Sequence, residues 1–462
     1  MNDHVAKLHR IRKNSGAQRT EGLPDEVVAE LAERDDSLCE AIDRAADLLE
    51  SAPEETKRLF ASDERALGEL VQREYLNFYG DDAVMPYVPL AAAGPWIVTA
   101  HGAVVHDSGG YGMLGLGHAP RAVLDVMSEP YVMANVMTPS VSQLRLAQRL
   151  RAEIGHARGD CPFHQFICMN SGSEAVAVAA RIADINALTA TRPGGRHAGR
   201  AVKSLSLVGG FHGRTTRPAQ VSDSTRAVYR KHLASFQRRD DLVTVELNDV
   251  ADLERAFEKA DADGVFFDAF FVEPVMGEGQ PGRAMEREFY DAARRLTAER
   301  GTLLVVDSIQ AALRATGSLS LVDYPGFEGC DPPQMETYSK ALNAGQFPLS
   351  VLALTEDAAA IYARGVYGNT MTTNPRALEV GCAVLESLDD ALRANIRERG
   401  VELVRKLEAL AEERPGAITS VRGTGLIVNA ELDPERYTVT GIGGVEENLR
   451  TRGVSMIHGG KN

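Results

Sequence analysis

The chain has 462 residues, of which 44% are hydrophobic and 25% charged, proportions that are ordinary for a soluble globular protein. This length can bury a large core and suggests two or three domains. A formal net charge of −15 argues against a nucleic acid or an anionic membrane as a partner. The five cysteines are dispersed, and no apolar run has membrane length, so we expect a cytoplasmic protein with reduced thiols and no metal site.

Residues 1–80 are predicted to form an N-terminal helical extension. The first twenty residues are basic, and we expect them to be frayed. Residues 23–79 are charged with a helical pattern, and Ser51 and Glu54 have the spacing of a capping box. Four apolar side chains share one helical face, namely Leu38, Ile42, Ala45 and Leu49. The pattern indicates a packing role for this extension.

Residues 81–145 are expected to supply the N-terminal part of a smaller α+β domain and a connecting segment. The apolar runs within residues 96–106 predict a hairpin that turns near Gly102. A helix is expected from about 120 to 127. Tyr111 lies in a glycine-rich stretch between the two and is a candidate to line a pocket.

Residues 146–374 alternate strands and helices, which predicts an α/β domain with a mostly parallel sheet and helices on both faces. Short apolar runs predict strands at 163–169, 204–208, 266–272, 302–306 and 349–354. Periodic runs predict helices at 173–188, 250–260 and 286–300. Residues 375–462 are expected to complete the smaller domain with two helices and a strand–turn–strand unit at 418–431.

Two residues of the α/β domain point to a cofactor. Asp307 follows the run at 302–306, which we interpret as a buried parallel strand, and α/β sheets bind ligands at the carboxyl ends of such strands. Lys340 lies in the polar segment 336–345 further along the chain. A carboxylate can hold the protonated ring nitrogen of pyridoxal phosphate (PLP), and a lysine can form a Schiff base with its aldehyde. We take this pair as the centre of the predicted site.

Two further motifs follow predicted strands and suit other parts of such a cofactor. Residues 170–174 open an alanine-rich helix, where Gly172 permits close approach, Ser173 can cap the helix, and free N–H groups suit a phosphate. Phe211 or His212, in a glycine-rich turn, can lie against a planar ring.

Two loops carry additional polar candidates. Glu273 and Glu278 follow the strand at 266–272, and we expect at least one of them to face the site. Thr370 lies in a polar loop before a predicted helix and offers a hydroxyl that can reach a phosphate.

Together and in this order, these motifs resemble the class III aminotransferases, PLP-dependent enzymes of fold type I that include ornithine, acetylornithine and 4-aminobutyrate aminotransferases. The resemblance covers roughly residues 86–462. The matching segments are N-S-G-S-E-A at 170–175, F-H-G-R-T at 211–215, E-P-V-M-G-E-G at 273–279, D-S-I-Q at 307–310, S-K-A-L at 339–342 and G-N-T with N-P at 368–375.

The resemblance implies the type I fold, with a large domain built on a mostly parallel seven-stranded sheet between helices and a smaller domain made from both ends of the chain. It implies that Lys340 is the Schiff-base lysine and proton shuttle. Asp307 would pair with the pyridine nitrogen, and Gln310 would lie near the ring hydroxyl.

The same resemblance implies the remaining contacts and a homodimer. Gly172 and Ser173 would bind the phosphate, and Phe211 would stack on the ring. Thr370 would bind the phosphate of the neighbouring subunit's cofactor, so the two subunits would share their active sites. The carboxylate of Glu278 would help to select between amine and keto-acid substrates.

The chain departs from the family pattern at several points. Ser308 replaces a usual glutamate, Val176 a usual asparagine, and Tyr367 a usual histidine. The segment 107–118 is shorter than usual. The family continues beyond the position of Asn462 with a strand that carries an arginine, so we expect the sequence to be cut short. These departures concern the substrate side more than the cofactor side.

The predicted activity is therefore transfer of an amino group from an amino acid or amine to a keto acid such as 2-oxoglutarate, by a ping-pong mechanism through Lys340. One alternative is a PLP-dependent aminomutase or racemase on the same fold. The other is a PLP-binding scaffold without catalytic activity. Dependence on two substrates separates the first alternative from a transaminase, and turnover of any amine excludes the second.

Overall fold

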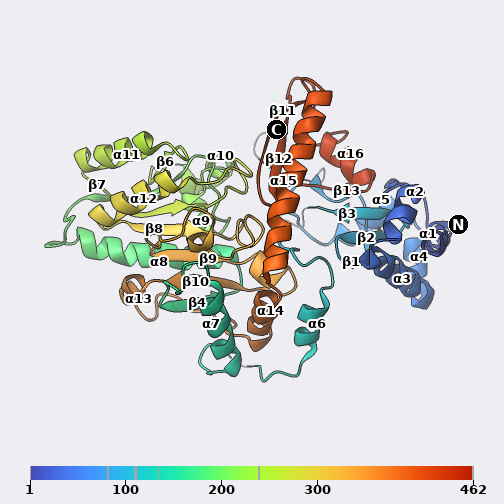
Figure 1. The fold of residues 1–462 in the computed structure, drawn as a ribbon, viewed down its shortest axis with the longest axis horizontal. Helices are drawn as coiled ribbons and strands as arrows, with labels where there is room; N and C mark the ends of the chain where they lie inside the picture. Colours follow the sequence, from blue (N-terminus) through green and yellow to red (C-terminus); the bar gives the residue numbers. More distant parts are fainter. Residues whose placement is uncertain (1, 81–82, 109–111, 134, 238–239, 460–462) are drawn as a thin grey trace.

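The computed structural model describes residues 2–80, 83–108, 112–133, 135–237 and 240–459. Figure 1 shows a large sheet with its helices on the left and the N-terminal helices with a small sheet on the right. The long helix α15 (Asp390–Glu413) runs between these two parts. Within the described ranges, no helix has the length and apolarity needed to cross a bilayer.

Helices at the start of the chain form one packed unit. They are α1 (Asp3–Asn14), α2 (Asp25–Ala32), α3 (Asp36–Ser51), α4 (Glu54–Phe60) and α5 (Glu64–Gln72). The expectation of a frayed beginning is wrong, because Val5, Leu8 and Ile11 of α1 are buried. They share an apolar cluster with Leu38 and Ile42 of α3, so burial of these side chains holds α1 in place.

The predicted apolar face of α3 is confirmed, but the predicted capping box is wrong. Leu38, Ile42 and Ala45 are fully buried, and Leu49 packs against their cluster. Ser51 instead ends α3, and its hydroxyl donates to the main-chain oxygen of Asp47 at 2.7 Å. The residue that precedes α4 is Pro53, which makes no side-chain cap.

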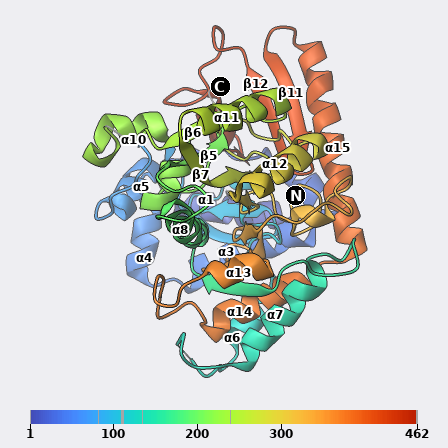
Figure 2. The same ribbon diagram turned by 90° about the vertical axis from the view of Figure 1, so that its left-hand side faces the viewer.

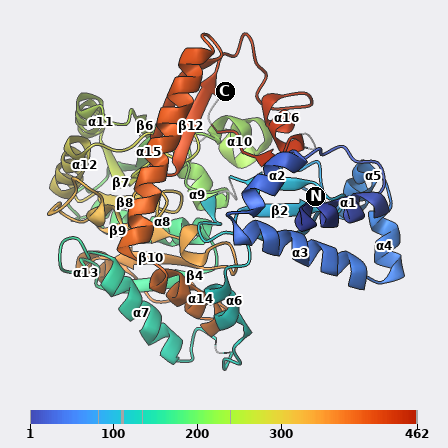
Figure 3. The ribbon, with the colours of Figure 1, turned by 45° about the vertical axis from the view of Figure 1, so that its right-hand side comes forward.

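A four-stranded sheet joins the two ends of the chain. Its strand order is β1 (Pro89–Ala93), β2 (Trp96–Thr99), β3 (Val104–Asp107) and β13 (Val454–Ser455). Strands β2 and β3 form the predicted antiparallel hairpin, and β13 pairs parallel with β3. Figure 3 shows α16 (Val445–Thr451) beside this sheet and close to α2. The N- and C-terminal segments therefore share one sheet, while the domain boundaries stay a prediction.

The large sheet has seven strands, as expected. Their order is β4 (Gln165–Met169), β10 (Ser350–Leu354), β9 (Met335–Tyr338), β8 (Leu303–Asp307), β7 (Val265–Val272), β5 (Ala201–Leu207) and β6 (Leu242–Val245). Strand β10 runs antiparallel to both of its neighbours, and the other pairings are parallel. Strands β6 and β9 were not predicted from the sequence, and β9 is the more important of the two because it leads directly to Lys340.

Helices cover both faces of this sheet. On one face lies α8 (Gly172–Thr191), and on the other lie α11 (Val250–Ala262) and α12 (Arg287–Arg300). Strand β7 shows the alternation, because Phe270 joins the α11–α12 side and Phe271 the α8 side. Figure 2 shows α6 (Arg121–Ser128), α7 (Val141–Glu153) and α14 (Pro375–Glu386) together below the sheet. Short helices complete the described elements: α9 (Thr216–Val221), α10 (Arg226–His232), α13 (Glu356–Ile361), η3 (Ala234–Phe236), η4 (Leu321–Asp323) and η5 (Ala341–Asn343).

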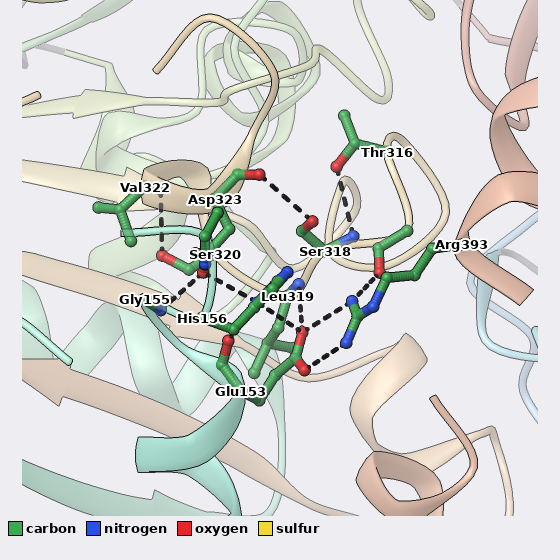
Figure 4. Close-up of polar contacts among 12 residues, drawn as sticks. Glu153, Gly155, His156, Thr316, Ser318, Leu319, Ser320, Val322, Asp323 and Arg393 are labelled. Carbon is green, nitrogen blue, oxygen red and sulfur yellow. Dashed lines mark hydrogen bonds and ion pairs between the residues drawn. The ribbon is translucent and has the colours of Figure 1, made fainter. Parts of the chain in front are cut away.

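The C-terminal part is held to the large sheet by a buried ion pair (Figure 4). Nη2 of Arg393, in the first turn of α15, lies 2.6 Å from Oε2 of Glu153 at the end of α7. Oε1 of Glu153 also accepts the N–H of Leu319 at 3.2 Å. Strands β11 (Ile418–Thr424) and β12 (Ile427–Leu432) then form the expected hairpin beside α15.

Candidate active site

The carboxyl ends of the parallel strands meet at a pocket of about 490 Å³. Strand β8 ends at Asp307, and Lys340 lies two residues after the end of the neighbouring strand β9. Eight of the predicted site residues line this pocket, namely Gly172, Ser173, Phe211, His212, Glu278, Asp307, Gln310 and Lys340. Sheet topology therefore brings together residues that are far apart in the sequence.

Asp307 is buried and held by three donors. Its Oδ1 accepts from the hydroxyl of Thr337 at 3.0 Å and from the N–H of Ile309 at 3.1 Å. Its Oδ2 lies 2.9 Å from Nδ1 of His212. Nε2 of the same imidazole lies 3.2 Å from Oγ of Ser206, inside the sheet. The imidazole of His212 is therefore occupied in holding the Asp307 carboxylate. Of the two aromatic candidates, Phe211 is the one that can lie against a cofactor ring.

Lys340 is largely buried in the pocket wall. Burial lowers the pKa of its amine to about 8, and the positive charge of Arg314 acts in the same direction. The carboxylates of Glu278 and Asp307 oppose the shift. About a tenth of the amine is therefore unprotonated at pH 7 and about half at pH 8, and the unprotonated form is the one that attacks an aldehyde.

The start of helix α8 forms a cradle for an anion. Ser171, and not Ser173 as predicted, caps this helix: its hydroxyl accepts the N–H of Glu174 in a complete capping box. The hydroxyl of Ser173 is thus available at the pocket. A Cβ on Gly213 would lie 2.3 Å from that hydroxyl, so only glycine leaves this space open. Free N–H groups at the start of a long helix suit a phosphate group.

The groups that line the pocket match the parts of a PLP molecule. The anion cradle suits its phosphate, the amine of Lys340 suits its aldehyde, and the carboxylate of Asp307 suits its ring nitrogen. Phe211 supplies an apolar wall for the ring. Among the described residues, no group of three or more metal-ligating side chains occurs. The donor set therefore matches PLP.

The two glutamates after β7 have different environments. Glu273 is buried and accepts the N–H groups of Phe211 at 2.9 Å and Gly277 at 3.0 Å, so it braces the turn beneath Phe211. Burial raises the pKa of Glu273 to about 7. Glu278 lines the pocket, with Oε1 3.6 Å from Nη2 of Arg214. Glu278 is thus the glutamate that faces the site, in keeping with the expectation that at least one would.

Arg214 was not among the predicted pocket residues. Its guanidinium carbon lies over the rings of Phe211 and Phe78 at 5.5 Å each and over that of Tyr79 at 5.8 Å. Tyr79 also lines the pocket. Residues that precede the segment 86–462, where we expected the resemblance, thus contribute to the rim, and the sequence carried no local signal for this contact because it joins distant segments.

Ser308, where the family pattern led us to expect a glutamate, lies beside the buried carboxylate of Glu336. The hydroxyl of Ser308 donates to Oε1 of Glu336 at 2.5 Å, and that of Ser320 donates to Oε2 at 2.5 Å. Leu321 donates its N–H to the same carboxylate at 2.9 Å. Burial raises the pKa of Glu336 to about 7. A glutamate of β9 therefore occupies the space behind Ser308.

The remaining two predicted residues are Tyr111 and Thr370. Tyr111 lies outside the described residues. Thr370 is exposed and does not line the pocket of its own chain, and its main-chain oxygen accepts the N–H of Val136 at 3.2 Å.

The comparisons with known proteins agree with this geometry. The family model described as "Aminotransferase class-III" matches residues 79–462. The chain is 30% identical over 359 residues to the acetylornithine aminotransferase of Neisseria meningitidis serogroup B, which covers 76% of this chain and 82% of that protein. It is 29% identical over 357 residues to the ornithine aminotransferase of Bordetella pertussis, with 74% and 77% covered.

Solved structures show the same fold. The ornithine aminotransferase of Toxoplasma gondii ME49 superimposes with a TM-score of 0.71 at 22% identity, covering 88% of this chain and 90% of that one. The acetylornithine aminotransferase of Elizabethkingia anophelis gives 0.66 at 21% identity, with 85% and 91% covered. A further structure of the T. gondii enzyme is described with PLP at its active site. The chain therefore belongs to the class III aminotransferases, the PLP-dependent enzymes of fold type I.

Proposed function

We propose that this aminotransferase takes an amino group from an amine or amino acid and passes it to a keto acid such as 2-oxoglutarate, in two half-reactions at one site. The observation that carries the proposal is the placement of Lys340 and Asp307 at the ends of neighbouring strands, in one pocket beside an anion cradle. When bound, PLP supplies an aldehyde that accepts the amino group and a ring that withdraws electrons.

Lys340 has two tasks in this proposal. Its amine, with a pKa of about 8, is available to bond to the aldehyde carbon at physiological pH. Beside a bound donor, the same amine would be the base that takes a proton from the donor carbon and the acid that gives it back. The charge of Arg314 assists both tasks because it disfavours the protonated ammonium.

The neighbouring residues orient the ring and hold a proton on it. The Asp307 carboxylate, fixed by Thr337 and His212, is placed to keep the ring nitrogen protonated. Phe211 covers one face of the ring, and the N–H groups of Gly172 and Ser173 hold the phosphate.

The pocket rim supports a donor that carries a negative charge away from its amine. Arg214 is the cation at the rim, and its nearest carboxylate, Glu278, is 3.6 Å away with both side chains partly exposed. This separation leaves Arg214 able to exchange Glu278 for a substrate carboxylate. Relatives named for acetylornithine, ornithine and aminoadipate semialdehyde have substrates of this kind.

We also propose a homodimer in which Thr370 reaches the partner's phosphate site. The loop with Thr370 is bonded to Val136, within a stretch that exposes several apolar side chains. Those exposed side chains are Val132, Met133, Val136, Met137, Val141 and Met371. An apolar surface of this kind is typical of a subunit interface. The cytoplasm remains the inferred location, from the five free cysteines.

An amine panel tests the proposed activity. PLP-loaded enzyme is mixed with single amines and amino acids in the absence of a keto acid, and the visible absorption of the cofactor is followed. A true donor should convert the aldehyde form to the amine form, and 2-oxoglutarate alone should then restore it. Turnover that needs no second substrate would favour an aminomutase or racemase. Bound PLP with no conversion across the panel would favour a scaffold.

A further inference from the structure

Arg314 lies one turn beyond Gln310 in the coiled segment that follows β8. Its Nε donates to the main-chain oxygen of Gln310, and its Nη2 donates to the side-chain Oε1 of the same residue at 3.2 Å. A guanidinium carries only donors, so the amide atom that faces it must be the oxygen. The NH₂ group of Gln310 is consequently left on the other side of the carboxamide, and Gln310 lines the pocket.

Two glycines leave the space that the side chains of Arg314 and Gln310 occupy. A Cβ on Gly112 would lie 2.3 Å from Nη1 of Arg314, and a Cβ on Gly277 would lie 2.5 Å from Cδ of Gln310. Leu313, directly before the arginine, has a φ of 63°, in the left-handed region that a branched side chain rarely adopts. Strain of this kind persists where the rest of the structure over-determines a conformation.

The guanidinium is also buried without a charged partner. Among the described residues, no carboxylate lies within ion-pair distance of Arg314, and burial lowers its pKa to about 10. Burying a cation in this way is costly, and the hydrogen bonds of its side chain to the two oxygen atoms of Gln310 offset part of that cost. A structural role alone would be served better by an apolar side chain of similar size.

The main chain of Arg314 fixes its position from the opposite side. Its carbonyl oxygen accepts the N–H of Leu426 at 2.8 Å, in the turn between β11 and β12. A Cβ on Gly425, in the same turn, would lie 2.0 Å from the carbonyl oxygen of Ala315. The C-terminal hairpin therefore packs directly on this segment and limits where the guanidinium can go.

We propose that Arg314 is a positioning residue that locks the carboxamide of Gln310 with its NH₂ group toward the pocket, where it donates to the ring oxygen of PLP. This inference rests on the proposed function, since it concerns the same site. Without Arg314 the carboxamide is free to rotate, and the donor is lost for part of the time. Arg314 itself touches neither substrate nor cofactor in this arrangement.

A double-mutant cycle on cofactor affinity tests the inference. Apoenzyme is titrated with PLP for the wild type, Arg314→Met, Gln310→Ala and the double variant. We expect each single variant to bind PLP about tenfold more weakly, the value of one hydrogen bond to a strong acceptor. The double variant should bind no more weakly than Arg314→Met alone, because the Gln310 donor is already lost there and the effect of the Arg314 charge on the pKa of Lys340 is common to both.

The matched control is Arg397→Met. Nη1 of Arg397, on α15, donates to the carbonyl oxygen of Thr316 at 3.0 Å, so this change removes an arginine that contacts the same segment without touching Gln310. It should leave the PLP affinity within about twofold of the wild type. If Arg314→Met does not fold, Arg314→Lys replaces it, and the same lack of additivity with Gln310→Ala is expected.

Two results would overturn the inference. One is unchanged PLP affinity in the Arg314 variant, and the other is a double variant weakened by about a hundredfold, as independent effects would give. Both leave the proposed function intact, because wild-type enzyme would still bind PLP through Lys340. A wild-type protein that binds no PLP would refute the proposed function, and this inference with it.

Discussion

The buried amine of Lys340 should destabilise the enzyme when PLP is absent. The pKa of this amine is lowered from 10.5 to about 8 in the folded chain, chiefly by burial. Unfolded chains therefore bind more protons than folded ones between those pH values, and stability rises as the pH rises through this window. Below pH 8 the full cost applies, which is about 3 kcal/mol for a shift of this size. By pH 10 it falls below about 1 kcal/mol.

The perturbation is Lys340→Met, which keeps the length of the side chain and removes its charge. PLP-free Lys340→Met should be more stable than PLP-free wild type by about 3 kcal/mol at pH 7, and most of this advantage should vanish at pH 10. Any gain from burying the methionine itself is independent of pH, so the change with pH is the diagnostic quantity. The assay is urea denaturation of both apoproteins at pH 7, 8, 9 and 10.

Lys259→Met serves as the control. Lys259 is exposed on α11 and paired with Asp263 at 2.7 Å, so its replacement should change stability little at any pH. An advantage of Lys340→Met that stays the same from pH 7 to pH 10 would refute the lowered pKa.

Two further predictions concern Asp307 in the pocket and the buried ion pair of Arg393 with Glu153. Asp307→Ala should reduce turnover about a hundredfold or more, because the ring nitrogen loses its counter-charge; activity within a factor of two of wild type would contradict this. Arg393→Leu should destabilise the fold by about 3–5 kcal/mol, because Glu153 would be left buried and unpaired, whereas Arg399→Leu in the exposed pair with Glu402 should cost under about 1 kcal/mol. Urea denaturation measures the stability of the Arg393→Leu and Arg399→Leu variants. Equal losses of stability in these two variants would contradict this prediction.

Much of the large sheet was predictable because its strands are apolar on both faces. The run at 266–272 corresponds to β7, where Phe270 and Phe271 are buried on opposite sides. Strand β9 was not predicted, because Met335–Tyr338 is short and contains a glutamate. Glu336 tolerates burial because Ser308, Ser320 and the N–H of Leu321 donate to it, and contacts between such distant residues leave no trace in a local pattern.

Some missed features did have a local signal. Val5, Leu8 and Ile11 recur at helical spacing, and this amphipathic pattern predicts the packed helix that α1 forms. Likewise, Ser171 stands three residues before Glu174, which is the spacing of the capping box that the structure contains. By contrast, Arg214 contacts Phe78 only through tertiary packing, so its position at the pocket rim could not be predicted from the sequence.

Covalent trapping shows directly whether Lys340 carries the cofactor. PLP-loaded enzyme is reduced with borohydride and digested, and the peptides are analysed by mass spectrometry. The account predicts one modified peptide, the one that contains Lys340, and no modification in Lys340→Ala. A reduced cofactor found on another lysine, or equal labelling of the wild type and Lys340→Ala, would contradict it.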